Sequence, residues 1–379
     1  MRVIMTGGGT GGHVNPALAI AETIKRNEPD SEIIFVGTKR GIENKLVPAA
    51  GYKLHHVDVR GIRRSLSLAN LRAFWLALTS PYKAKKLIRE FEPDVVIGTG
   101  GYVSWPVVKA ASMMGVPCAL HESNAIAGVA VKMLQDKADR IYLNFEATGK
   151  TLHCPEKLLR VGNPLAGDFA RMSREEAREA LGIDKKYKNV ILSYGGSMGA
   201  EKVNDAVLSI MKDYSSKNPD TLHIHATGSI EWEIAKDQFK KMGLDKHENL
   251  ELVEYIYDMP VKMAAADIII CRAGALTISE LAISGKCPIF IPSPNVTENH
   301  QYKNAKVLAD AGAAFVFEEH QLKENTKLLC DTVKDLLSDD GREERALMSE
   351  RIREFAIPDA NRLIYNDVKK LISEKKKKK

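Results

Sequence analysis

One local pattern occurs twice in the chain, and it constrains the fold more than any other feature. The segment VIMTGGGTGGHVNPALAIAETI begins at Val3, and the similar segment VILSYGGSMGAEKVNDAVLSIM begins at Val190. Each reads as a short buried strand, a glycine-rich turn and a helix, which is the opening unit of a parallel α/β domain. The chain has 379 residues, too many for one ordinary core. The sequence therefore predicts two α/β domains of similar size.

Short apolar runs alternate with longer helical stretches in both halves. The first half contains EIIFVG, DVVIGTGG, VPCAL and RIYL, and the second contains NVILSYGG, TLHIHATG, LELV, DIIICRAG and CPIFIP. Strands of this kind, separated by helices, form parallel sheets that are covered by helices on both faces. We therefore expect two Rossmann-like domains that face each other across a cleft.

The segment VGNPLAG interrupts regular structure after the last predicted strand of the first half. It predicts a first domain at residues 1–163 and a second at residues 164–357. A terminal helical stretch at about 358–373 has no later strand to reach. We expect this stretch to pack back on the first domain.

The first glycine-rich turn, TGGGTGGHVNP at residues 6–16, has five glycines in six positions and is followed by a histidine. Because glycine has no side chain, a bulky anion can approach the turn amides and the positive end of the helix dipole. The turn therefore predicts a phosphate or diphosphate site. Pro16 is expected in the first turn of the helix that follows.

The same turn also fits the dinucleotide fingerprint G-x-G-x-x-G through Gly7, Gly9 and Gly12. An NAD-binding domain needs an acidic residue at the end of its second strand, and the sequence there is GTKRG. NAD is therefore disfavoured, and NADP would depend on Lys39 and Arg40.

Composition excludes several classes of function. The formal charge of +6 disappears almost entirely when the five C-terminal lysines are set aside, so it indicates no nucleic-acid partner. Five scattered cysteines without a C-x-x-C pair indicate neither disulfides nor a zinc site, as in a reducing cytosol. No D-x-D motif follows a strand, so we expect no metal ion and no cofactor. No apolar run reaches the ~20 residues of a membrane span, which indicates a soluble or peripherally attached protein.

Candidate ligand-binding residues in the second half follow the carboxyl ends of predicted strands, where open parallel sheets bind ligands. They are Ser197, Glu280, His300 and Gln301 through their side chains, and Ile256 through its backbone. Ala275 opens a helix whose N–H groups can hold a diphosphate, and the Glu280 carboxylate further along can accept hydrogen bonds from a ribose diol. The backbone of Ile256 can pair with a base edge. A solvated helix carboxylate is the alternative for Glu280, and ordinary helix-start polar residues are the alternative for His300 and Gln301.

Taken together, these motifs resemble glycosyltransferase family 28, which has the GT-B fold of two Rossmann-like domains. The resemblance covers residues 1 to about 370 and rests on GGGTGGHVNP, PDVVIGTGGYVSWPV, HESNAIAG, VGNP, GGSMGA, CRAGALTISE, NHQYKNA and IPDA. It implies an inverting, metal-independent hexosyltransferase of peptidoglycan synthesis. The implied reaction moves N-acetylglucosamine (GlcNAc) from the donor substrate UDP-GlcNAc to the 4-hydroxyl of the muramoyl sugar (MurNAc) of lipid I, undecaprenyl-pyrophosphoryl-MurNAc-pentapeptide, and gives lipid II.

The resemblance also implies roles for single residues. Ile256 would meet the uracil, Glu280 the ribose, and residues 275–277 the diphosphate. Gln301, with His300, would bind the GlcNAc hydroxyls. The residues expected to bind substrate are Thr10, Gly11, Gly12 and Asn124 in the first domain, and Ser197, Ile256, Ala275, Leu276, Thr277, Ile278, Ser279, Glu280, His300 and Gln301 in the second.

His13 is the expected catalytic residue, because an attacking hydroxyl needs a base that titrates near neutral pH. Two alternatives stay open: Glu122 in HESNAIAG could be the base, or His13 could bind the lipid diphosphate. The other paired histidines have no carboxylate or cysteine partner nearby in the sequence. We interpret His55, His56, His223 and His225 as structural.

Two positions depart from the family pattern. Leu165 and Ala166 follow GNP, where many members have an arginine, and Met198 stands where a glutamine or arginine is frequent. Both departures bear on donor affinity rather than on the activity.

The segment SLANLRAFWLALTSPYKAKKLIREF indicates how the protein meets a membrane. An apolar surface, followed by basic residues, is formed by Leu68, Leu71, Phe74, Trp75, Leu76 and Leu78, then Lys83, Lys85, Lys86 and Arg89. This combination is typical of a helix at an anionic lipid surface, although a core-facing helix with a basic end gives the same pattern. We expect peripheral attachment to the cytoplasmic face of the cell membrane, to which Lys375 to Lys379 could add. The expected partners are UDP-GlcNAc, lipid I, the anionic inner-membrane surface and other cell-wall and division proteins, but no nucleic acid.

Two other functions share parts of the pattern. A non-catalytic scaffold could bind nucleotide sugars, but it would need neither His13 nor Glu280. A non-hydrolysing UDP-GlcNAc epimerase has the same architecture, but it would not need the apolar, basic segment.

Overall fold

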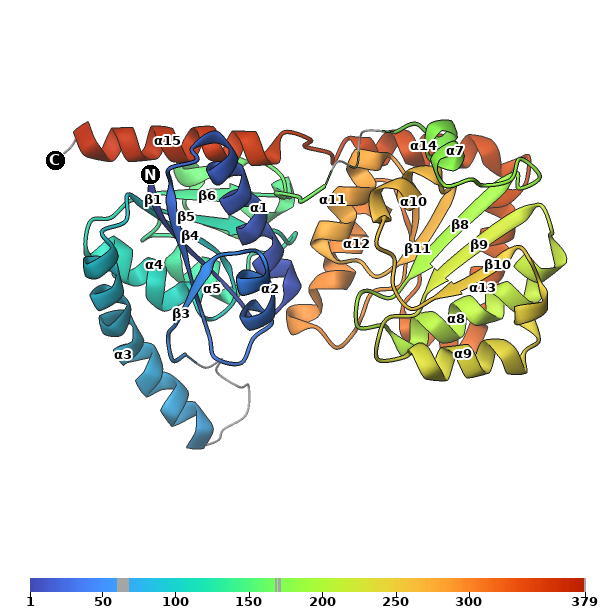
Figure 1. The fold of residues 1–379 in the computed structure, drawn as a ribbon, viewed down its shortest axis with the longest axis horizontal. Helices are drawn as coiled ribbons and strands as arrows, with labels where there is room; N and C mark the ends of the chain where they lie inside the picture. Colours follow the sequence, from blue (N-terminus) through green and yellow to red (C-terminus); the bar gives the residue numbers. More distant parts are fainter. Residues whose placement is uncertain (60–67, 168, 170–171, 378–379) are drawn as a thin grey trace. The chain divides into compact units, whose positions relative to one another are not determined.

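The structure is a computed structural model that describes residues 1–59, 68–167, 169 and 172–377, and only the backbone of residues 68–78 and 323–325. The chain forms two compact units, Met1–Ala166 with Ile357–Lys379, and Gly167–Ala356 (Figure 1). Each unit is one parallel sheet with helices on both faces. The predicted architecture of two Rossmann-like domains is confirmed.

The sheet of the first unit has seven parallel strands in the order β3-β2-β1-β4-β5-β6-β7. The strands are β1 (Arg2–Gly7), β2 (Glu32–Gly37), β3 (Lys53–His56), β4 (Val95–Gly100), β5 (Cys118–Glu122), β6 (Arg140–Leu143) and β7 (Leu158–Arg160). The helices are α1 (Gly11–Asn27), α2 (Glu43–Ala49), α3 (Leu68–Phe91), α4 (Ser104–Met113), α5 (Val129–Leu134), α6 (Glu146–Gly149) and α15 (Ala360–Lys377), with a 3₁₀ turn at Pro155–Lys157.

Alternation along β1 divides the core of the first unit between the two faces of the sheet. Val3 and Met5 pack with α1 and α15, whereas Ile4 packs with α4 and α5 on the other face. Strands that are buried on both faces must be apolar at every position, which is why β1 reads as a continuous apolar run. On α1 one covered helix face is formed by residues three or four positions apart, Val14, Ala17, Ile20, Ala21 and Ile24, and it is widened by the buried Pro16 and Ala19.

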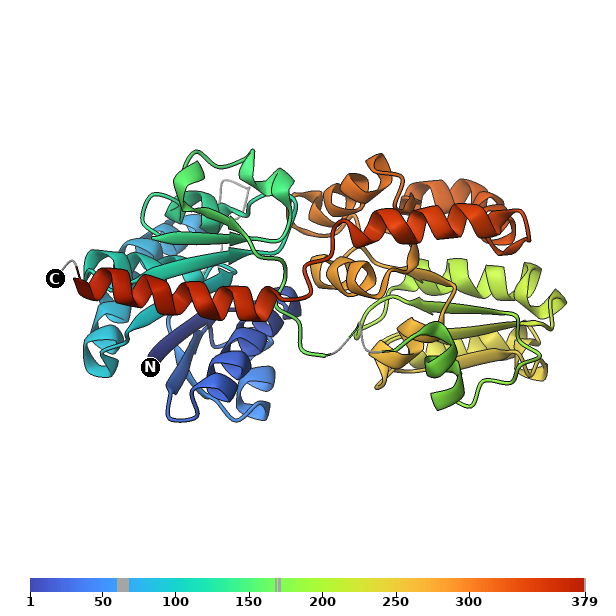
Figure 2. The ribbon, with the colours of Figure 1, turned by 90° about the horizontal axis from the view of Figure 1, so that it is seen from above.

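The C-terminal helix α15 belongs to the first unit and runs along it beside α1 (Figure 2). Its apolar face is buried in the same core cluster as β1 through Ile364, Val368, Leu371 and Ile372. Its polar contacts to this unit are Tyr142–Asp367 (2.9 Å), Arg140–Glu374 (2.8 Å), Lys375–Asp139 (2.8 Å) and Lys376–Asp94 (3.0 Å). Two lysines of the terminal run are therefore ion-paired to the protein, and Lys378 and Lys379 lie outside the described residues.

The sheet of the second unit has six parallel strands in the order β10-β9-β8-β11-β12-β13. The strands are β8 (Asn189–Tyr194), β9 (Thr221–Ala226), β10 (Leu250–Val253), β11 (Ile268–Cys271), β12 (Cys287–Phe290) and β13 (Phe315–Val316). The helices are α7 (Arg174–Ala180), α8 (Glu201–Asp213), α9 (Trp232–Lys241), α10 (Met259–Ala265), α11 (Ala275–Ser284), α12 (His300–Asp310), α13 (Glu319–Leu337) and α14 (Gly341–Arg353). Short 3₁₀ turns lie at Ser215–Lys217, Leu244–Lys246 and Thr297–Asn299.

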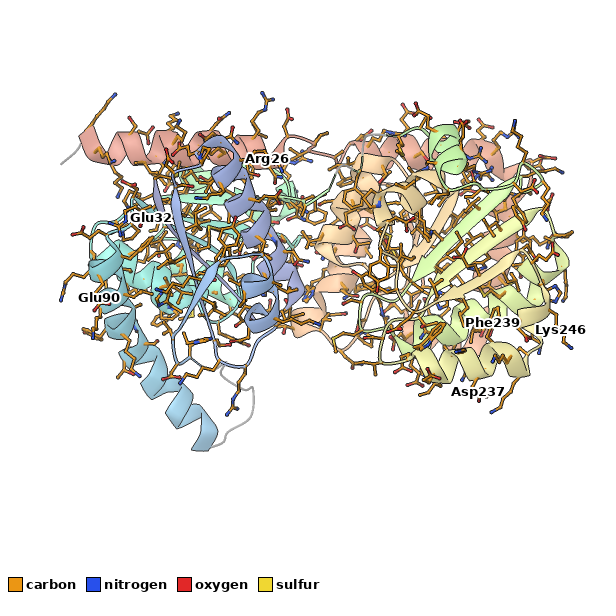
Figure 3. The ribbon with its side chains drawn as sticks, viewed as in Figure 1. Arg26, Glu32, Glu90, Asp237, Phe239 and Lys246 are labelled. Atoms are coloured by element: carbon orange, nitrogen blue, oxygen red, sulfur yellow. The ribbon has the colours of Figure 1, made fainter. Side chains whose placement is uncertain are left out.

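The helices of the second unit are amphipathic, as their position over a sheet requires. On α9, Ala235 and Phe239 are buried, whereas Asp237 is exposed and pairs with Lys241 at 2.6 Å (Figure 3). Phe239 joins an apolar cluster that includes Ile191 of β8 and Ile268 of β11. One face of each helix therefore stabilises the unit, and the other contacts water.

Both sheets have a switch point beside their first strand. In the first sheet β1 lies between β2 and β4, and in the second β8 lies between β9 and β11. The loops that leave β1 and β4 at their carboxyl ends diverge toward opposite faces of the first sheet, and the loops that leave β8 and β11 do the same in the second. Between such loops an open α/β sheet has a crevice in which ligands bind. The two glycine-rich turns follow β1 and β8, so each lies at the switch point of its own sheet.

Candidate active site

The glycine-rich turn of the first unit joins β1 to α1. Gly9 has a φ of +88°, a left-handed conformation that glycine adopts without strain. Thr10 is the N-cap, and α1 begins at Gly11. Pro16 is therefore the sixth residue of the helix rather than a member of its first turn, and the prediction was wrong because the helix starts within the glycine run. Since proline has no N–H, the Gly12 carbonyl receives no bond from residue 16.

The side chain of His13, in the first turn of α1, folds back over the glycine-rich turn. Its Nδ1 atom lies 3.1 Å from the Gly8 carbonyl oxygen and 3.4 Å from Thr10 Oγ1. Because a carbonyl only accepts, Nδ1 carries the proton in the bond to Gly8, and the lone pair of the neutral ring is then on Nε2. A Cβ atom at Gly100 would come within 2.5 Å of His13 Cδ2. The imidazole is therefore held in one tautomer, in space that Gly100 leaves open.

Glu43, the first residue of α2, is fully buried and holds the turn from the side of β2. Its Oε2 accepts a hydrogen bond from the Gly9 N–H at 2.9 Å, and its Oε1 accepts from the Thr38 N–H at 2.9 Å and from the Thr38 hydroxyl at 2.8 Å. Burial opposes ionisation, but these hydrogen bonds outweigh it and lower the pKa of Glu43. The Gly9 amide, which the sequence predicted for phosphate, thus already binds an internal anion.

The pocket of the Glu43 carboxylate is made of glycines. A Cβ atom would come within 2.6 Å of Glu43 at Gly8 and at Gly37, and still closer at Gly41. These glycines are therefore explained by a side chain of the protein itself as much as by any ligand.

The first unit has a further glycine-rich segment at the end of β4, which packs against the turn that follows β1. Thr99 Oγ1 donates to the His13 carbonyl at 2.7 Å, and Ser104 Oγ donates to the Thr6 carbonyl at 3.1 Å. A Cβ atom at Gly101 would lie within 2.4 Å of the Gly8 carbonyl oxygen. Because Gly101 has no side chain, the two turns can pack closely here. The two turns at this switch point thus support each other.

Asn124 and Glu122 lie at the end of β5 in the same sheet. Glu122 Oε1 accepts hydrogen bonds from the N–H and the side-chain amide of Asn124, both at 3.0 Å, and Oε2 accepts from the Gly128 N–H at 2.7 Å. Both oxygens of this 6% exposed carboxylate are thus occupied by the protein. Its geometry fits a residue that orients Asn124 and the start of α5.

The glycine-rich turn of the second unit carries Ser197, which is exposed. The turn pairs with the loop after β9, since Ser229 N–H donates to the Ser197 carbonyl and Ile230 N–H to the Met198 carbonyl, both at 3.2 Å. Gly228 fits against this turn because a Cβ atom there would come within 2.0 Å of the Gly199 nitrogen. Main-chain contacts therefore set the shape of the Ser197 turn.

Helix α11 follows β11 directly, with Gly274 as its N-cap. Its first intrahelical bond runs from Ile278 N–H to the Gly274 carbonyl at 3.0 Å, so the amides of residues 275–277 precede the helical hydrogen-bond ladder. The first turn contains no acidic side chain. Ile278 was also expected to contact substrate, but its side chain is completely buried and belongs to the core. Ser279 Oγ donates to the Ala275 carbonyl at 3.2 Å.

Glu280 is the sixth residue of α11 and is half-buried beside the end of β8. Burial raises the pKa of its carboxyl to about 7. Tyr194 and Cys271, the last residues of β8 and β11, lie close to this carboxyl. Burial raises the pKa of both side chains, and the negative charge of Glu280 raises them further. A half-buried carboxylate at this place is costly to ionise without donors, and a ribose diol supplies two.

Ile256, His300 and Gln301 follow the ends of β10 and β12. The Ile256 side chain is buried, which leaves only its backbone for a ligand, and it is flanked by the exposed rings of Tyr255 and Tyr257, 5.0 Å apart. Gln301 Oε1 accepts from the Ser293 N–H at 2.9 Å.

The start of α12 is strained. His300 Nδ1 donates to the Thr297 carbonyl at 2.8 Å, and Glu298 and Asn299 have φ values of +57° and +53°. Left-handed backbone at non-glycine residues is typical of ligand-binding loops. The loop before α12 is therefore preorganised by its own contacts.

Sequence reasoning missed Glu43, Thr99 and Gly100. The dinucleotide pattern requires an acidic residue at the end of β2, whereas Glu43 lies six residues past Gly37, at the start of the next helix. The contacts of Glu43 with Gly8, Gly37 and Gly41 appear only in the structure, so the sequence carried no local signal for this residue.

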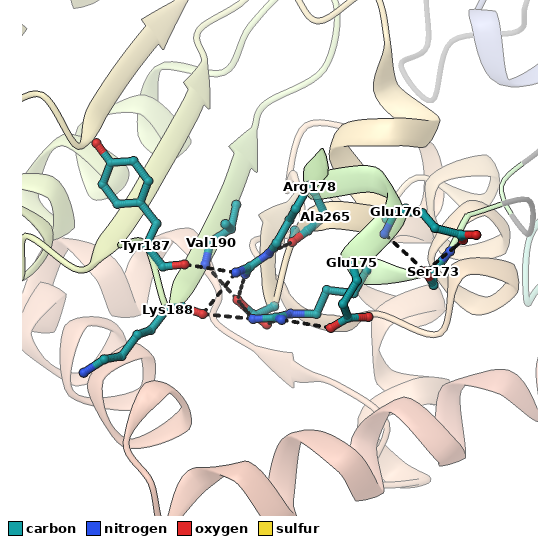
Figure 4. Close-up of polar contacts among 12 residues, drawn as sticks. Ser173, Glu175, Glu176, Arg178, Tyr187, Lys188, Val190 and Ala265 are labelled. Atoms are coloured by element: carbon teal, nitrogen blue, oxygen red, sulfur yellow. Dashed lines mark hydrogen bonds and ion pairs between the residues drawn. The ribbon is translucent and has the colours of Figure 1, made fainter. Parts of the chain in front are cut away.

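A cavity of about 1130 Å³ lies at the other end of the second sheet, where its strands begin. Asp267 pairs there with Arg174 at 2.7 Å and Arg178 at 2.6 Å and accepts from the Val190 N–H at 2.7 Å. Arg178 also donates to the carbonyls of Ala265, Tyr187 and Lys188 (Figure 4). These groups satisfy one another, so we interpret the cluster as structural.

The part of the chain that the structure describes contains no group of three His, Cys, Asp or Glu side chains placed to ligate a metal ion. None of its described helices is both long enough and apolar enough to cross a membrane.

Comparison with known proteins relates the whole chain to one family. Residues 3–143 match the glycosyltransferase family 28 N-terminal domain, and residues 190–362 match its C-terminal domain. A protein from Acetivibrio thermocellus named UDP-N-acetylglucosamine--N-acetylmuramyl-(pentapeptide) pyrophosphoryl-undecaprenol N-acetylglucosamine transferase is 41% identical, over 99% of each chain. The protein of the same name from Lactococcus lactis subsp. cremoris is 37% identical, over 98% of this chain and 99% of the relative.

Solved structures give the same relationship. The crystal structure of Acinetobacter baumannii MurG superimposes with a TM-score of 0.76 at 27% identity, over 97% of this chain and 99% of that one. A UDP-GlcNAc 2-epimerase from Neisseria meningitidis, bound to UDP-GlcNAc, has a TM-score of 0.66 at 14% identity, over 98% of this chain and 100% of that one, and shares the fold alone. The chain therefore belongs to glycosyltransferase family 28 and is a homologue of MurG.

Proposed function

We propose that this chain transfers GlcNAc from UDP-GlcNAc to the MurNAc 4-hydroxyl of lipid I, with inversion, and so forms lipid II. Relatives that match its whole length are named as N-acetylglucosamine transferases of N-acetylmuramyl-(pentapeptide) pyrophosphoryl-undecaprenol. The proposal rests on one observation. This family member has the His13 turn after β1, at the switch point of the first sheet, and the Glu280 helix after β11, beside β8 at the switch point of the second. The first supplies a base, and the second a site for a nucleotide diphosphate.

The donor binds to the second unit. The amides at residues 275–277 and the positive end of the α11 dipole meet the diphosphate, and no acidic side chain in that turn opposes it. The Glu280 carboxylate accepts the ribose hydroxyls, and the Ile256 backbone pairs with the uracil. Ser197, in the turn after β8, binds the phosphates, and His300 and Gln301, at the start of α12, bind the GlcNAc. Charge on the departing UDP is then met by amides and helix dipoles, so the reaction requires no metal ion or cofactor.

The acceptor reacts at His13. The MurNAc 4-hydroxyl attacks the anomeric carbon of GlcNAc on the face opposite to UDP, the new C–O bond forms, and the bond to the UDP oxygen breaks. The hydroxyl proton passes to His13 Nε2, because the bond from Nδ1 to the Gly8 carbonyl keeps the lone pair on Nε2. Thr10, Gly11, Gly12 and Asn124 surround the acceptor.

The alternatives to His13 as base differ in their geometry and pH dependence. Both oxygens of Glu122 accept bonds from Asn124 and Gly128, which favours His13 as the base. If His13 instead binds the lipid diphosphate as a cation, activity falls as pH rises through the ordinary histidine range. A base requires activity to rise over the same range.

We also propose that the first unit attaches peripherally to anionic lipid at the cytoplasmic face of the cell membrane. The described end of α3 exposes Lys83 and Lys86 beside Tyr82, which is 66% exposed, and the half-buried Lys85 places its Nζ 5.4 Å from the Tyr82 ring centroid. Helix α4 packs against both α3 and α5 and carries the half-exposed Met113. Basic residues around exposed apolar ones fit an anionic interface. The side chains of the predicted apolar surface, Leu68 to Leu78, lie outside the described residues.

One experiment separates this function from its rivals. The purified chain is incubated with UDP-GlcNAc alone, and then with UDP-GlcNAc and lipid I. A transferase leaves the nucleotide sugar unchanged in the first incubation and forms a β-linked disaccharide lipid in the second. UDP-N-acetylmannosamine in the first would indicate an epimerase, and binding without either product would indicate a scaffold.

A further inference from the structure

We propose that Glu43, the peptide group between Gly8 and Gly9, and His13 form a hydrogen-bonded relay that orients and polarises the imidazole. The inference rests on the role proposed above for His13. It adds a positioning residue to the reaction, one that touches neither substrate.

The geometry of the relay follows from the identity of its middle member. The Gly8 carbonyl and the Gly9 N–H belong to one planar peptide group. Its N–H donates to Glu43 Oε2 at 2.9 Å, and its oxygen accepts from His13 Nδ1 at 3.1 Å. A carboxylate and an imidazole are therefore bonded to the two ends of a single amide.

An anion bonded to an amide N–H increases the negative charge on the carbonyl oxygen of the same group. Hydrogen bonds in such a chain strengthen one another by roughly 10–30% each. A stronger acceptor at Gly8 favours the tautomer of His13 with its proton on Nδ1, and it stabilises the imidazolium that forms when Nε2 takes the substrate proton. A buried Asp bonded directly to histidine has this effect in hydrolase triads, and here one peptide group stands between the two residues.

The carboxylate of Glu43 is fixed strongly enough for this role. It is fully buried, its second oxygen is held by Thr38, and glycines of two loops close around it. Its lowered pKa keeps it ionised at neutral pH. Thr99 and Gly100, which approach the His13 turn from the end of β4, are neutral, and Lys39 and Arg40, on the loop after Thr38, are exposed. Among these groups the buried charge is that of Glu43.

The test reads the tautomer directly. In protein labelled with ¹⁵N-histidine, the ring nitrogen shifts of His13, assigned by His13→Gln, report which nitrogen carries the proton. The wild-type ring is expected to be mainly protonated on Nδ1, and Glu43→Gln is expected to move it toward a mixture of tautomers. The side-chain amide introduced by Glu43→Gln has one acceptor oxygen and no charge, so it cannot serve Gly9 and Thr38 together.

Glu28→Gln is the matched control. Glu28 is also a hydrogen-bonded carboxylate of the first unit, bonded to Met1 at 3.2 Å and Tyr365 at 3.1 Å, but it has no contact with the turn. Its loss should leave the His13 shifts unchanged. Equal tautomer populations in wild type and Glu43→Gln would overturn the relay, whatever the activity.

Activity then tests the link to the reaction. Glu43→Gln should lower kcat by ~10–100-fold, as loss of a residue that orients a reacting group does, with the KM for UDP-GlcNAc within about twofold. A shifted tautomer with normal kcat would keep the relay and instead reject His13 as the base. If Glu43→Gln does not fold, the wild-type protein still decides, because the Gly9 amide proton must shift as the His13 ring titrates. A Gly9 resonance that ignores this titration would contradict the relay.

Discussion

His13 Nδ1 and Glu43 Oε2 are bonded to opposite ends of the same peptide group, at 3.1 Å and 2.9 Å. This relationship changes how the glycine-rich turn is understood. A turn of this composition suggests amides that wait for phosphate, yet one of its amides is already committed to an internal carboxylate. In the proposed function, the residues of this turn that contact substrate are Thr10, Gly11 and Gly12 at the start of α1.

The binding of UDP-GlcNAc should strengthen as pH rises, because only the ionised form of Glu280 accepts the ribose hydroxyls. With a pKa of about 7, ionised Glu280 increases roughly tenfold between pH 6 and pH 8. The donor Kd should fall by about the same factor, measured by calorimetry. UDP-GlcNAc is the better probe than UDP, whose terminal phosphate titrates near 6 as phosphate monoesters do.

Glu280→Gln should abolish this pH dependence and weaken binding about tenfold or more, since charge-assisted hydrogen bonds contribute ~1.5–3 kcal/mol. Glu251→Gln, which changes an exposed carboxylate of β10, is the control and should bind like wild type. A Glu280→Gln protein with wild-type affinity at pH 8 would remove Glu280 from the donor site.

Gly100→Ala should inactivate the enzyme while leaving it folded. The added methyl group would lie within 2.5 Å of the His13 ring and displace the base. Turnover should fall by ~10²–10⁴, the usual worth of a general base. Gly115→Ala is the control for a side chain at a positive-φ glycine, because Gly115 has a φ of +68°, against +112° at Gly100, and has open space around its Cβ position. Comparable turnover in the two variants would mean that His13 does not need its observed position.

The basic end of α3 should contribute directly to lipid binding. Replacing Lys83, Lys85 and Lys86 with glutamine removes three charges near the surface, each worth ~1 kcal/mol on an anionic membrane, so vesicle affinity should fall roughly a hundredfold. Sedimentation with phosphatidylglycerol vesicles measures it. The control replaces Lys236, Lys240 and Lys241 of α9 in the second unit. Equal loss in both triple variants would indicate attraction by net charge alone.

Acid should destabilise the second unit through its buried histidines. Ser193 Oγ lies 3.0 Å from His223 Nε2 and 2.9 Å from His225 Nδ1, and both rings are fully buried. Burial lowers the pKa of His223 well below its ordinary value and that of His225 to about 4. Because the unfolded chain binds these protons more readily, stability is complete above pH 6.5 and is lost as pH falls toward 4.

For His225 alone the loss amounts to about 3 kcal/mol, at 1.36 kcal/mol per pH unit. Urea unfolding of wild type and His225→Gln between pH 4.5 and 7 checks this. The variant should have a lower slope of unfolding free energy against pH. Parallel slopes would show that His225 does not titrate in this window.

The sequence predicted the interior strands of both sheets but only one of their four edge strands. EIIFVG and RIYL coincide with the interior strands β2 and β6, because strands buried on both faces carry apolar runs, and LELV coincides with the edge strand β10. The other edge strands, β3, β7 and β13, have no comparable apolar run and were not predicted. His55 and His56, interpreted as structural, lie on β3, where His56 bonds to Asn44 at 2.8 Å.

Among the candidate site residues, those that belong to a local sequence pattern could be found, and those that depend on distant contacts could not. Turns and helix starts next to a strand were visible as local patterns, so the segments around His13, Ser197 and Ala275 could be found. Glu43 could not, because its function depends on contacts with Gly9 and Thr38, which no periodicity encodes.

The most direct test of the proposed function is transfer of radiolabelled GlcNAc from UDP-GlcNAc to lipid I by the purified chain, with lipid-extractable label as the readout. We predict label in the lipid fraction from the wild-type protein. His13→Ala should incorporate it ~10²–10⁴ times more slowly, with nearly unchanged donor binding. A wild-type protein that binds UDP-GlcNAc but leaves the lipid unlabelled, or a His13→Ala protein as fast as wild type, would contradict it.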